Sequence, residues 1–312
     1  MKINDLIFRE LVKRGYKLES ENRVWNLADS KLWYLTPKQA QGYLDLEKAG
    51  EYKKSITDKE VSLIKKQIEE ITRNMPYDSC NLVDLGCGDG TKAELFIKEM
   101  SKHLKLRYCP IDISSYMVSK AANTIRKTKI GEVLEFRWNI SDFENLDNIT
   151  PLFRDDKFKF HLMMLLGNTL GNFDKDNILN GIKDSMINGD VLVIGNGITN
   201  GKKQDWIKSY KNEKINRWLI QIPKQIGLNK NEIDYDVRFV NSRVEEMYIL
   251  KKDKTIKHLG QIVNFKRGDI LIVAISYKYS TEDFKRLISR FFSKIKIYTD
   301  AEETYALAIC KK

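Results

Sequence analysis

The chain has 312 residues, of which 42% are hydrophobic and 31% charged, and its formal net charge is +11 at pH 7. This composition is that of a globular protein and excludes a disordered or fibrous chain. No run of about 18 apolar residues is present, and the N-terminal segment lacks the apolar core of a secretion signal. We therefore expect a cytoplasmic protein that does not span a membrane.

The cysteines, histidines and lysines indicate which metal sites, disulfides and nucleic-acid interactions are not expected. The four cysteines include no Cys-x-x-Cys pair and the chain has three histidines, so neither a metal site nor a disulfide framework is expected. Lysines contribute most of the positive charge and are scattered along the whole chain. This distribution favours a solvated surface over a nucleic-acid-binding face.

Residues 1–74 are predicted to be mainly helical. Apolar side chains recur at helical spacing late in this region, at Val61, Ile64, Ile68 and Ile71. The segment from Val24 to Pro37 is rich in aromatic residues and is too apolar for a linker. Two compatible interpretations remain open for it: a helical lid that packs on the main domain, or a lid that also closes a ligand pocket.

Strands and helices alternate from residue 80 onward. Apolar strands are predicted at 81–85, 107–112, 134–138, 160–166 and 191–194. Helices are predicted at 92–102, 116–127 and 176–186. Repeated β-α units with apolar strands predict a parallel sheet that helices cover on both faces.

Residues 200–276 break this alternation with lysine- and tryptophan-rich helices, followed by alternating segments that suit an antiparallel sheet. The core pattern then returns with a helix after Ser280 and two closing strands. We therefore expect an α/β fold with a Rossmann-like sheet. Its four parts are a helical N-terminal lid (1–74), the core (75–199), a smaller inserted α+β domain (200–276) and a C-terminal completion of the core sheet (277–312).

The first motif that points to chemistry is Asp84-Leu85-Gly86-Cys87-Gly88-Asp89-Gly90. A glycine turn directly after an apolar strand lets the backbone approach a ligand closely. Dinucleotide-binding folds use a related turn with the spacing GxGxxG and an unobstructed helix N-terminus. Here the spacing is GxGxG and Asp84 precedes the turn, which favours a cationic ligand such as the sulfonium of S-adenosylmethionine (SAM).

Acidic residues follow the next two predicted strands. Asp112 ends the second strand, about two dozen residues after the glycines, where such folds place an acid that accepts hydrogen bonds from ribose hydroxyls. Asp142 and Phe143 follow the third strand, where an acid can bind the adenine amino group and an aromatic ring can cover the base. Three such features at consecutive strand ends predict a SAM-dependent methyltransferase.

A polar loop, Gly167-Asn168-Thr169-Leu170-Gly171-Asn172, follows the fourth strand, whose carboxyl end is expected to face the transferred methyl group. The asparagines and the threonine can orient a polar acceptor. An amine acceptor reacts in its neutral form, so proximity and desolvation can supply most of the rate and no strong base is required.

These motifs resemble those of the histidine Nα-methyltransferases of ergothioneine biosynthesis, a family that also includes amino-acid and indole-alkaloid N-methyltransferases. The resemblance extends from about Trp25 to the C-terminus and is most specific at the glycine turn and at 110–112, 142–143 and 167–172. It implies a discontinuous Rossmann core, an inserted substrate domain and SAM as the cofactor. It also implies that Asn172 and Tyr210 hold the amino-acid substrate.

The motifs and the resemblance together define the candidate site. The candidate cofactor-binding residues are Asp84, Gly86, Gly88, Lys92, Asp112, Asp142, Phe143 and Gly167. The candidate substrate-binding residues are Trp33, Tyr34, Asn168, Asn172, Tyr210, Met247, Ala274 and Ser276. Asn172 and Tyr210 are also the candidate catalytic residues, and no metal ligand is expected.

Two departures from the family's histidine enzymes concern the substrate. Those enzymes carry a Tyr-Tyr pair where this chain has Trp33-Tyr34, and a glutamate where it has Ala274, whereas Met247 and Ser276 match. A buried donor without an acceptor costs about 1–3 kcal/mol. The resemblance therefore implies a larger, less polar pocket in which histidine is a poor acceptor and a bulkier amine is preferred.

Three functions remain open. The first is N-methylation of an amino acid or an amino-acid-like small amine other than histidine. The second is methylation of a macromolecule, either protein or RNA. The third is SAM binding without catalysis, which the intact candidate SAM residues disfavour. A shift of the alignment by one or two residues would place Glu245 or Glu246 in the substrate pocket instead of Ala274.

Overall fold

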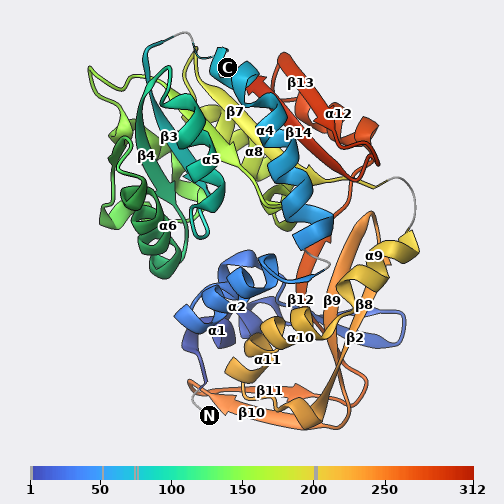
Figure 1. Ribbon diagram of the computed structural model, residues 1–312. Coiled ribbons are helices and arrows are strands. Elements are labelled where there is room, and N and C mark those ends of the chain that lie inside the picture. The colour runs from blue at the N-terminus through green and yellow to red at the C-terminus, as the bar shows by residue number, and fades with distance from the viewer. Residues whose placement is uncertain (1–2, 51–52, 74, 76, 200–202) are drawn as a thin grey trace. The chain divides into compact units, whose positions relative to one another are not determined.

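The computed structural model describes residues 3–50, 53–73, 75, 77–199 and 203–312 (Figure 1). The chain forms two compact units. The smaller unit contains Met1–Leu35 and Lys202–Lys278, and the larger unit contains Thr36–Gly201 and Tyr279–Lys312. None of the helices in these described ranges has the length and apolar character needed to cross a lipid bilayer.

The larger unit contains a seven-stranded sheet in the order β13-β14-β7-β6-β3-β4-β5. Its strands are β3 (Ser79–Leu85), β4 (Lys105–Ile111), β5 (Glu132–Val133), β6 (His161–Leu165), β7 (Val191–Gly197), β13 (Lys294–Thr299) and β14 (Tyr305–Lys311). The strands β5, β4, β3, β6 and β7 are parallel, and β14 is antiparallel to both β7 and β13. This mixed α/β fold, with a largely parallel central sheet, confirms the predicted fold class.

The strand order reverses beside β3, because the chain builds β4 and β5 on one side of it and then places β6 on the other. Parallel α/β sheets bind ligands in the crevice beyond the carboxyl ends of the strands at such a reversal. The strands at this point are almost completely buried, as expected for a sheet with helices on both faces. The topology therefore points to the loops that follow β3 and β6.

The larger unit also contains long and short helices, several of which pack against one another or against the sheet. The longer ones are α2 (Pro37–Glu47), α4 (Asp58–Arg73), α5 (Thr91–Met100), α6 (Ser115–Thr128), α8 (Lys175–Ser185) and α12 (Thr281–Ser289). The shorter ones are η2 (Lys53–Thr57), η3 (Arg137–Asn139), η4 (Phe143–Asn145), α7 (Leu146–Ile149), η5 (Thr150–Phe153) and η6 (Thr169–Asn172). Helix α4 packs against α5 and β14, and α5 packs against α6 (Figure 1).

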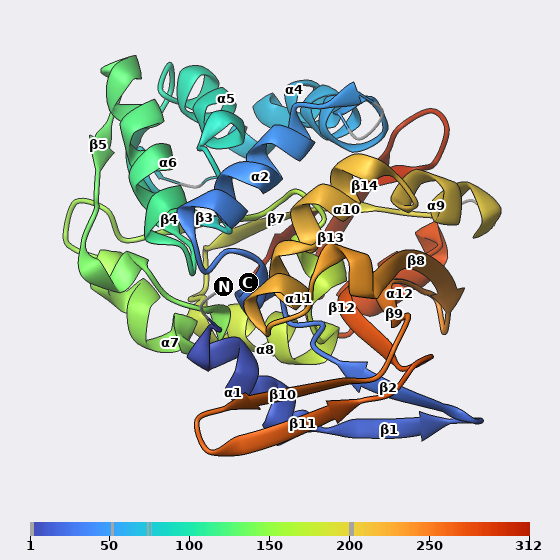
Figure 2. The ribbon, with the colours of Figure 1, turned by 90° about the horizontal axis from the view of Figure 1, so that it is seen from below.

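The smaller unit contains a five-stranded sheet in the order β1-β2-β12-β9-β8 and a separate hairpin of β10 and β11. Its strands are β1 (Tyr16–Glu19), β2 (Asn22–Asn26), β8 (Ile233–Val240), β9 (Arg243–Leu250), β10 (Lys254–His258), β11 (Gln261–Phe265) and β12 (Ile270–Tyr277). Its helices are α1 (Asp5–Arg14), η1 (Ser30–Trp33), α9 (Lys203–Tyr210), α10 (Glu213–Leu219), α11 (Gln221–Gln225) and η7 (Lys230–Glu232). The hairpin lies beside α1 and β2 (Figure 2), where Trp25 contacts Phe265 with ring centroids 4.9 Å apart.

A β-bulge interrupts the pairing of β12 with β9. Ile272 lies opposite Met247, but Ala274 lies opposite Glu246, so Val273 is the extra residue. Because successive side chains in a strand point to opposite faces, this one-residue shift moves the side chains after the bulge to the other face. Ile272 and Met247 therefore share one face of the sheet, and Ala274 shares the opposite face with Glu246.

One predicted strand is absent, and one hairpin was not predicted. The N-terminal region is mainly helical, as predicted, with α1, η1, α2, η2 and α4, but β1 and β2 form a hairpin that the sequence did not predict, and β2 pairs in parallel with β12. Residues up to Leu35 therefore belong to the smaller unit, whereas the rest of the predicted N-terminal segment belongs to the larger unit. The predicted strand at 134–138 is absent: the side chain of Asn139 accepts a hydrogen bond from the Phe136 amide and donates to the Pro110 carbonyl, and this replaces a strand ladder.

Candidate active site

The glycine turn after β3 has two different structural requirements. Gly86, Gly88 and Gly90 all have positive φ angles, of 75°, 54° and 77°, which favour glycine. A Cβ atom at Gly90 would lie 2.9 Å from Cα of Ala121, so α6 requires glycine there. A Cβ at Gly88 would meet only Leu44 Cδ2, at 4.0 Å. The turn therefore packs tightly at Gly90 and leaves space for a ligand at Gly88.

Two buried aspartates lie beneath and beside this turn. Asp84 accepts a hydrogen bond from the Tyr108 hydroxyl at 2.8 Å, and burial raises the pKa of Asp84 to about 7. Asp112, at the end of β4, accepts hydrogen bonds from the backbone amides of Ser114 and Gly88, and burial raises its pKa to about 6. Asp112 is thus bonded directly to the open position of the turn, which fits an acceptor for ribose hydroxyls.

Lys92, in the first turn of α5, is held by two carboxylates. Its Nζ lies 3.0 Å from Glu47 and 3.0 Å from Glu60. Burial alone would lower the pKa of Lys92, but these carboxylates outweigh it and raise the pKa above its ordinary value. Glu60 also accepts a hydrogen bond from the Gly167 amide at 2.8 Å and one from the Tyr305 hydroxyl. Lys92 and Glu60 thereby hold the loop after β6 beside the glycine turn.

Phe143 lies next to the glycine turn, which is the position required of an aromatic ring that covers the nucleoside of a bound cofactor. Its Cζ is 3.7 Å from the position of a Cβ at Gly86, and its ring packs against Phe173 with centroids 5.2 Å apart. Asp142 caps the short helix η4 by accepting a hydrogen bond from the Glu144 amide at 2.9 Å. Both residues occupy the loop after β5 in which the sequence predicted an adenine site.

Two asparagines at the carboxyl ends of β6 and β7 have incompletely paired side chains. Asn168 adopts a left-handed conformation (φ 64°) and its Oδ1 accepts from the Gly197 amide, but no described residue pairs with its buried Nδ2. Asn196 donates to the Gly197 carbonyl at 2.8 Å, and its buried Oδ1 likewise has no described partner. Buried polar atoms without a protein partner usually bond a water molecule or a ligand.

A polar cluster in the smaller unit is centred on Lys278. Its Nζ donates to the hydroxyls of Tyr210 and Ser276, each at 2.8 Å, and Tyr210 also bonds Ser276 at 3.2 Å. The Lys278 side chain is only 2% exposed, and its Nζ lies 4.6 Å from the centre of the Trp206 ring. No described carboxylate forms an ion pair with this ammonium group. The cluster is therefore a buried cationic site lined by hydroxyl groups.

The bulge in β12 determines which candidate substrate residues share a face with this cluster. Ala274 and Ser276 lie on the same face as Glu246, whereas Met247 packs on the opposite face with Val24 and Ile272. The structure therefore does not bring Met247 together with Ser276, contrary to the expectation from sequence. The pKa of the buried Glu246 carboxyl is raised to about 8 by burial, although Lys278 opposes the shift.

Trp33 and Tyr34 belong to an aromatic cluster in the smaller unit. The Trp33 indole donates a hydrogen bond to the carbonyl of Val273, the bulged residue, at 2.9 Å. The rings of Trp33 and Trp218 lie edge to face with centroids 5.7 Å apart, and those of Tyr34 and Trp218 are 6.0 Å apart. Trp33 is therefore fixed on the backbone residue that precedes Ala274.

A family model described as histidine-specific methyltransferase, SAM-dependent, matches residues 47–312. The chain belongs to this family. It is a SAM-dependent methyltransferase, as the sequence motifs predicted, and the open position at Gly88, the carboxylate of Asp112 and the ring of Phe143 fit that cofactor. Among curated proteins none matches the chain.

Several solved methyltransferase structures are also similar to the chain. A SAM-dependent methyltransferase from Clostridium acetobutylicum ATCC 824 shares 15% identity at a TM-score of 0.42, over 78% of this chain and 88% of the other. The CurJ carbon methyltransferase shares 11% identity at a TM-score of 0.45, over 80% of this chain and 53% of the other. The glycopeptide N-methyltransferase MtfA, solved with SAM, shares 8% identity at a TM-score of 0.35, over 79% and 92%.

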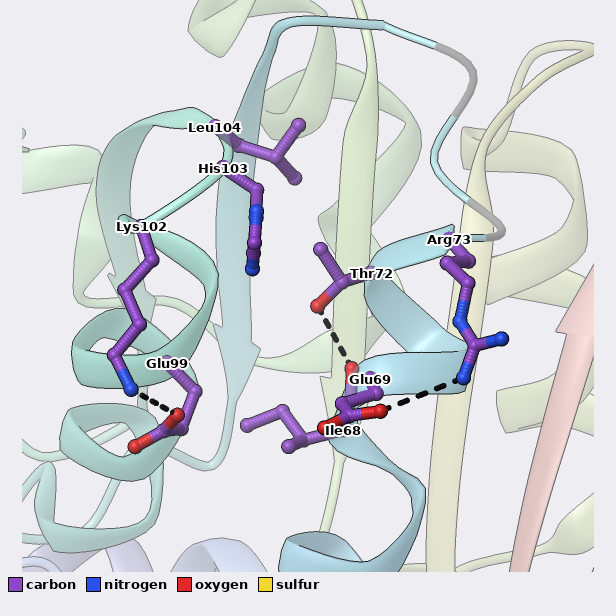
Figure 3. A pocket seen from close by; sticks show the side chains of 8 residues that line it. All are labelled: Ile68, Glu69, Thr72, Arg73, Glu99, Lys102, His103 and Leu104. Carbon is purple, nitrogen blue, oxygen red and sulfur yellow. Dashed lines mark hydrogen bonds and ion pairs between the residues drawn. The ribbon is translucent and has the colours of Figure 1, made fainter.

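A cavity of about 550 Å³ in the methyltransferase lies away from these residues (Figure 3). It is lined by side chains of α4 and by the end of α5 with the loop that leads into β4: Ile68, Glu69, Thr72, Arg73, Glu99, Lys102, His103 and Leu104. Leu104 precedes the amino end of β4, whereas the candidate site lies at the carboxyl ends of the strands. The charged groups pair with each other, Glu99 with Lys102 and Glu69 with Arg73. This cavity is therefore not the methyltransferase site.

Sequence reasoning missed three residues of these clusters, Glu60, Asn196 and Lys278, and it named Glu246 only as an alternative to Ala274. Two had a visible signal. Glu60 lies four residues before Ile64, so it is an acidic residue on the buried face of the amphipathic helix α4. Lys278 lies two residues after Ser276, which itself lies two residues after Ala274, so it continues their alternation along the chain. The candidates also divide between the units: the cofactor residues, Asn168 and Asn172 lie in the larger unit, and the remaining substrate candidates lie in the smaller one.

Proposed function

We propose that this enzyme transfers the methyl group of SAM to the amino nitrogen of an amino acid or an amino-acid-like small amine. The observation that carries the proposal is the pair of incompletely bonded amides, Asn168 and Asn196, at the strand ends beside the glycine turn. A neutral amine already has a free lone pair and needs orientation rather than a base. Neutral amide groups suit that task because they orient a nucleophile without protonating it.

The residues of the larger unit would divide the work of cofactor binding. Asp112 would accept hydrogen bonds from ribose hydroxyls, and the ring of Phe143 would cover the adenine. When bound, SAM supplies a methyl group activated by a sulfonium. Asn168 and Asn172 would orient the acceptor amine, and the half-buried Asn172 side chain has no hydrogen-bond partner in the described part of the chain.

The smaller unit supports an acceptor that carries a carboxylate. Lys278 is a buried cation whose described partners are the neutral hydroxyls of Tyr210 and Ser276. A buried charge is costly unless it is paired, so an anionic group of a ligand would complement it. We therefore infer that this cluster by itself can bind the carboxylate of a ligand, with Tyr210 and Ser276 as further hydrogen-bonding groups.

The preference among amino acids depends on whether the substrate site contains an acidic side chain. The family's histidine enzymes carry a glutamate at the position of Ala274 in this chain. The sequence argument against histidine rests on Ala274 and leaves open that Glu245 or Glu246 enters the pocket instead. Glu246 lies directly opposite Ala274 on the same face of the sheet, which supports this alternative. Histidine is therefore one of the acceptors to be compared with bulkier amines such as tryptophan and tyrosine.

The experiment is a SAM-consumption assay with histidine, tryptophan, tyrosine, phenylalanine, their N-acetyl derivatives, RNA and peptides as acceptors. We expect free amino acids to be methylated on the amino nitrogen and the N-acetyl derivatives to be inert. Gly88→Val serves as the cofactor-deficient control, because its side chain enters the open position of the turn and requires a strained φ of 54°. Turnover of RNA or peptides alone, or of N-acetyl amino acids, would overturn the proposal.

A further inference from the structure

Glu246 is a buried acidic residue that the proposed mechanism has not used. Its side chain is only 4% exposed, and no described residue forms a hydrogen bond or an ion pair with its carboxyl group. Burial of an unpaired carboxyl group is unfavourable. Such a residue therefore calls for a role that the folded protein alone does not provide.

The preceding residue, Glu245, shows how this strand normally accommodates a buried carboxylate. Glu245 lies on the opposite face and is 0% exposed, and Arg238 and Arg243 donate to its oxygens at 2.6 and 2.8 Å. Both of its oxygens are thus neutralised, one by Arg238 of β8 and the other by Arg243 of β9 itself. Glu246 has no such partner, which distinguishes a site for a ligand from a structural ion pair.

Glu246 lies on the face of the sheet that carries a small side chain, Ala274, and one residue of the polar cluster, Ser276. Its cross-strand partner is Ala274, and directly opposed residues have Cβ atoms about 4.5–5.5 Å apart. Ser276 is the next residue on that face of β12, and it bonds Lys278. Glu246 therefore lies on the same face as one residue of the cluster inferred above to bind a ligand carboxylate.

We propose that Glu246 is a specificity-determining residue whose carboxyl group accepts a hydrogen bond from an N–H or O–H group on the side chain of the acceptor. The preferred acceptors are then amino acids with a donor at the far end of the side chain. Their isosteres without that donor leave the buried carboxyl group unpaired and react more slowly. This inference rests on the proposed function and adds the basis of substrate choice.

The test measures kcat/KM for three matched pairs of acceptors: tyrosine and phenylalanine, tryptophan and benzothienylalanine, and histidine and thienylalanine. Only the first member of each pair carries a side-chain N–H or O–H donor, and histidine also carries an acceptor nitrogen that thienylalanine lacks. A lost hydrogen bond to a buried carboxyl group corresponds to roughly 10- to 100-fold. We expect the wild-type enzyme to prefer the donor-bearing member of at least one pair by this factor, and Glu246→Leu to bring that ratio close to one without changing SAM affinity.

Two further variants test the role of the Glu246 carboxyl group. Glu246→Gln preserves the shape if the leucine variant does not fold, and it should reduce the ratio at least threefold. The exchange Glu246→Ala with Ala274→Glu moves the carboxyl group to the facing strand and should restore part of the preference. Unchanged ratios in the folded Glu246 variants would overturn the inference.

Glu245→Gln is the matched control. It removes a carboxylate from the adjacent position but on the other face, so it should lower the melting temperature and leave the acceptor ratios unchanged. A change of ratio equal to that of Glu246→Gln would assign the effect to strand distortion and overturn the inference. If the wild-type enzyme methylates no amino acid, the proposed function fails; if it does so without distinguishing the pairs, only the role of Glu246 fails.

Discussion

At the residue scale, two buried aspartates of the larger unit lie at the glycine turn. Asp112 and Asp84 are both buried, and burial raises the pKa of each above the ordinary value of 3.8. Asp84 is held by the Tyr108 hydroxyl beneath the turn, whereas Asp112 is bonded to the Gly88 amide at the turn itself. A buried acid that is retained at the open part of a glycine turn is typical of a ligand site.

Asp112→Asn should therefore stabilise the protein and weaken cofactor binding. The folded-state pKa of about 6 exceeds the unfolded value, so the contribution of Asp112 to stability is present below about pH 4 and is lost as the pH rises through 6. At pH 7.5 we expect the free energy of unfolding of the ligand-free variant to increase by on the order of 2 kcal/mol. At pH 4 we expect no gain.

Urea denaturation at the two pH values measures the effect of Asp112→Asn on stability, and calorimetry measures SAM affinity. We expect SAM to bind at least about tenfold more weakly, because the charged acceptor for the ribose hydroxyls is lost. Wild-type SAM affinity would show that Asp112 is not a cofactor ligand. A loss of stability at pH 7.5 would show that its carboxylate is structural.

Among the secondary-structure elements, the amphipathic helix α4 carries one buried acidic residue that connects it with three other segments. Three of the four apolar residues predicted to share its face, Ile64, Ile68 and Ile71, are buried. Glu60 lies on the same stripe and connects α4 with Lys92 of α5, with Gly167 after β6 and with Tyr305 of β14. The helix therefore positions the loop that follows β6 through a single carboxylate.

Glu60→Gln tests this connection without changing the size of the side chain. The substitution removes one of the two carboxylates that neutralise Lys92. Breaking a buried ion pair costs about 3–5 kcal/mol, and the lower end applies because Glu47 still pairs with Lys92. We expect a decrease of this order in the free energy of unfolding, measured by urea denaturation, and weaker SAM binding.

Glu69→Gln on the same helix provides the comparison for Glu60. Glu69 is 85% exposed and pairs with Arg73 at 3.5 Å, so its loss should have little effect. Similar stabilities for the two variants would contradict the role assigned to Glu60.

At the scale of the whole molecule, the positive charge is the feature that most invites a macromolecular substrate. Several lysines are already paired with acids on the surface, for example Lys48 with Asp89 and Lys59 with Asp300 and Glu302. A scattered, partly neutralised charge contacts few phosphates at once. The net charge of +11 therefore does not by itself predict RNA binding.

We expect no tight RNA binding at physiological salt. Fluorescence anisotropy with a labelled single strand and a labelled hairpin, at low and physiological salt concentrations, measures the affinity and its salt dependence. Weak binding that disappears with added salt is the expected result. A sub-micromolar affinity at physiological salt would instead favour a macromolecular acceptor.

The sequence by itself determined the class of fold, the enzyme class and the cofactor. Apolar strands and glycines that need positive φ are local properties, so the strands β3, β4, β6 and β7 and the turn at Gly86 could be located from residue types. The candidate cofactor residues could be listed because the carboxyl ends of parallel strands meet at one edge of the sheet. Their contacts with SAM remain predictions.

Only the tertiary structure decided what depends on long-range pairing. The hairpin of β1 and β2 belongs to the smaller unit because β2 pairs with β12, more than 200 residues later, and local helical propensity does not report this. The bulge at Val273 places Met247 on one face and Ala274 with Glu246 on the other, because a shift of one residue reverses the direction of every following side chain in β12. The environment of a buried acid such as Glu246 or Glu60 is likewise set by residues distant in sequence.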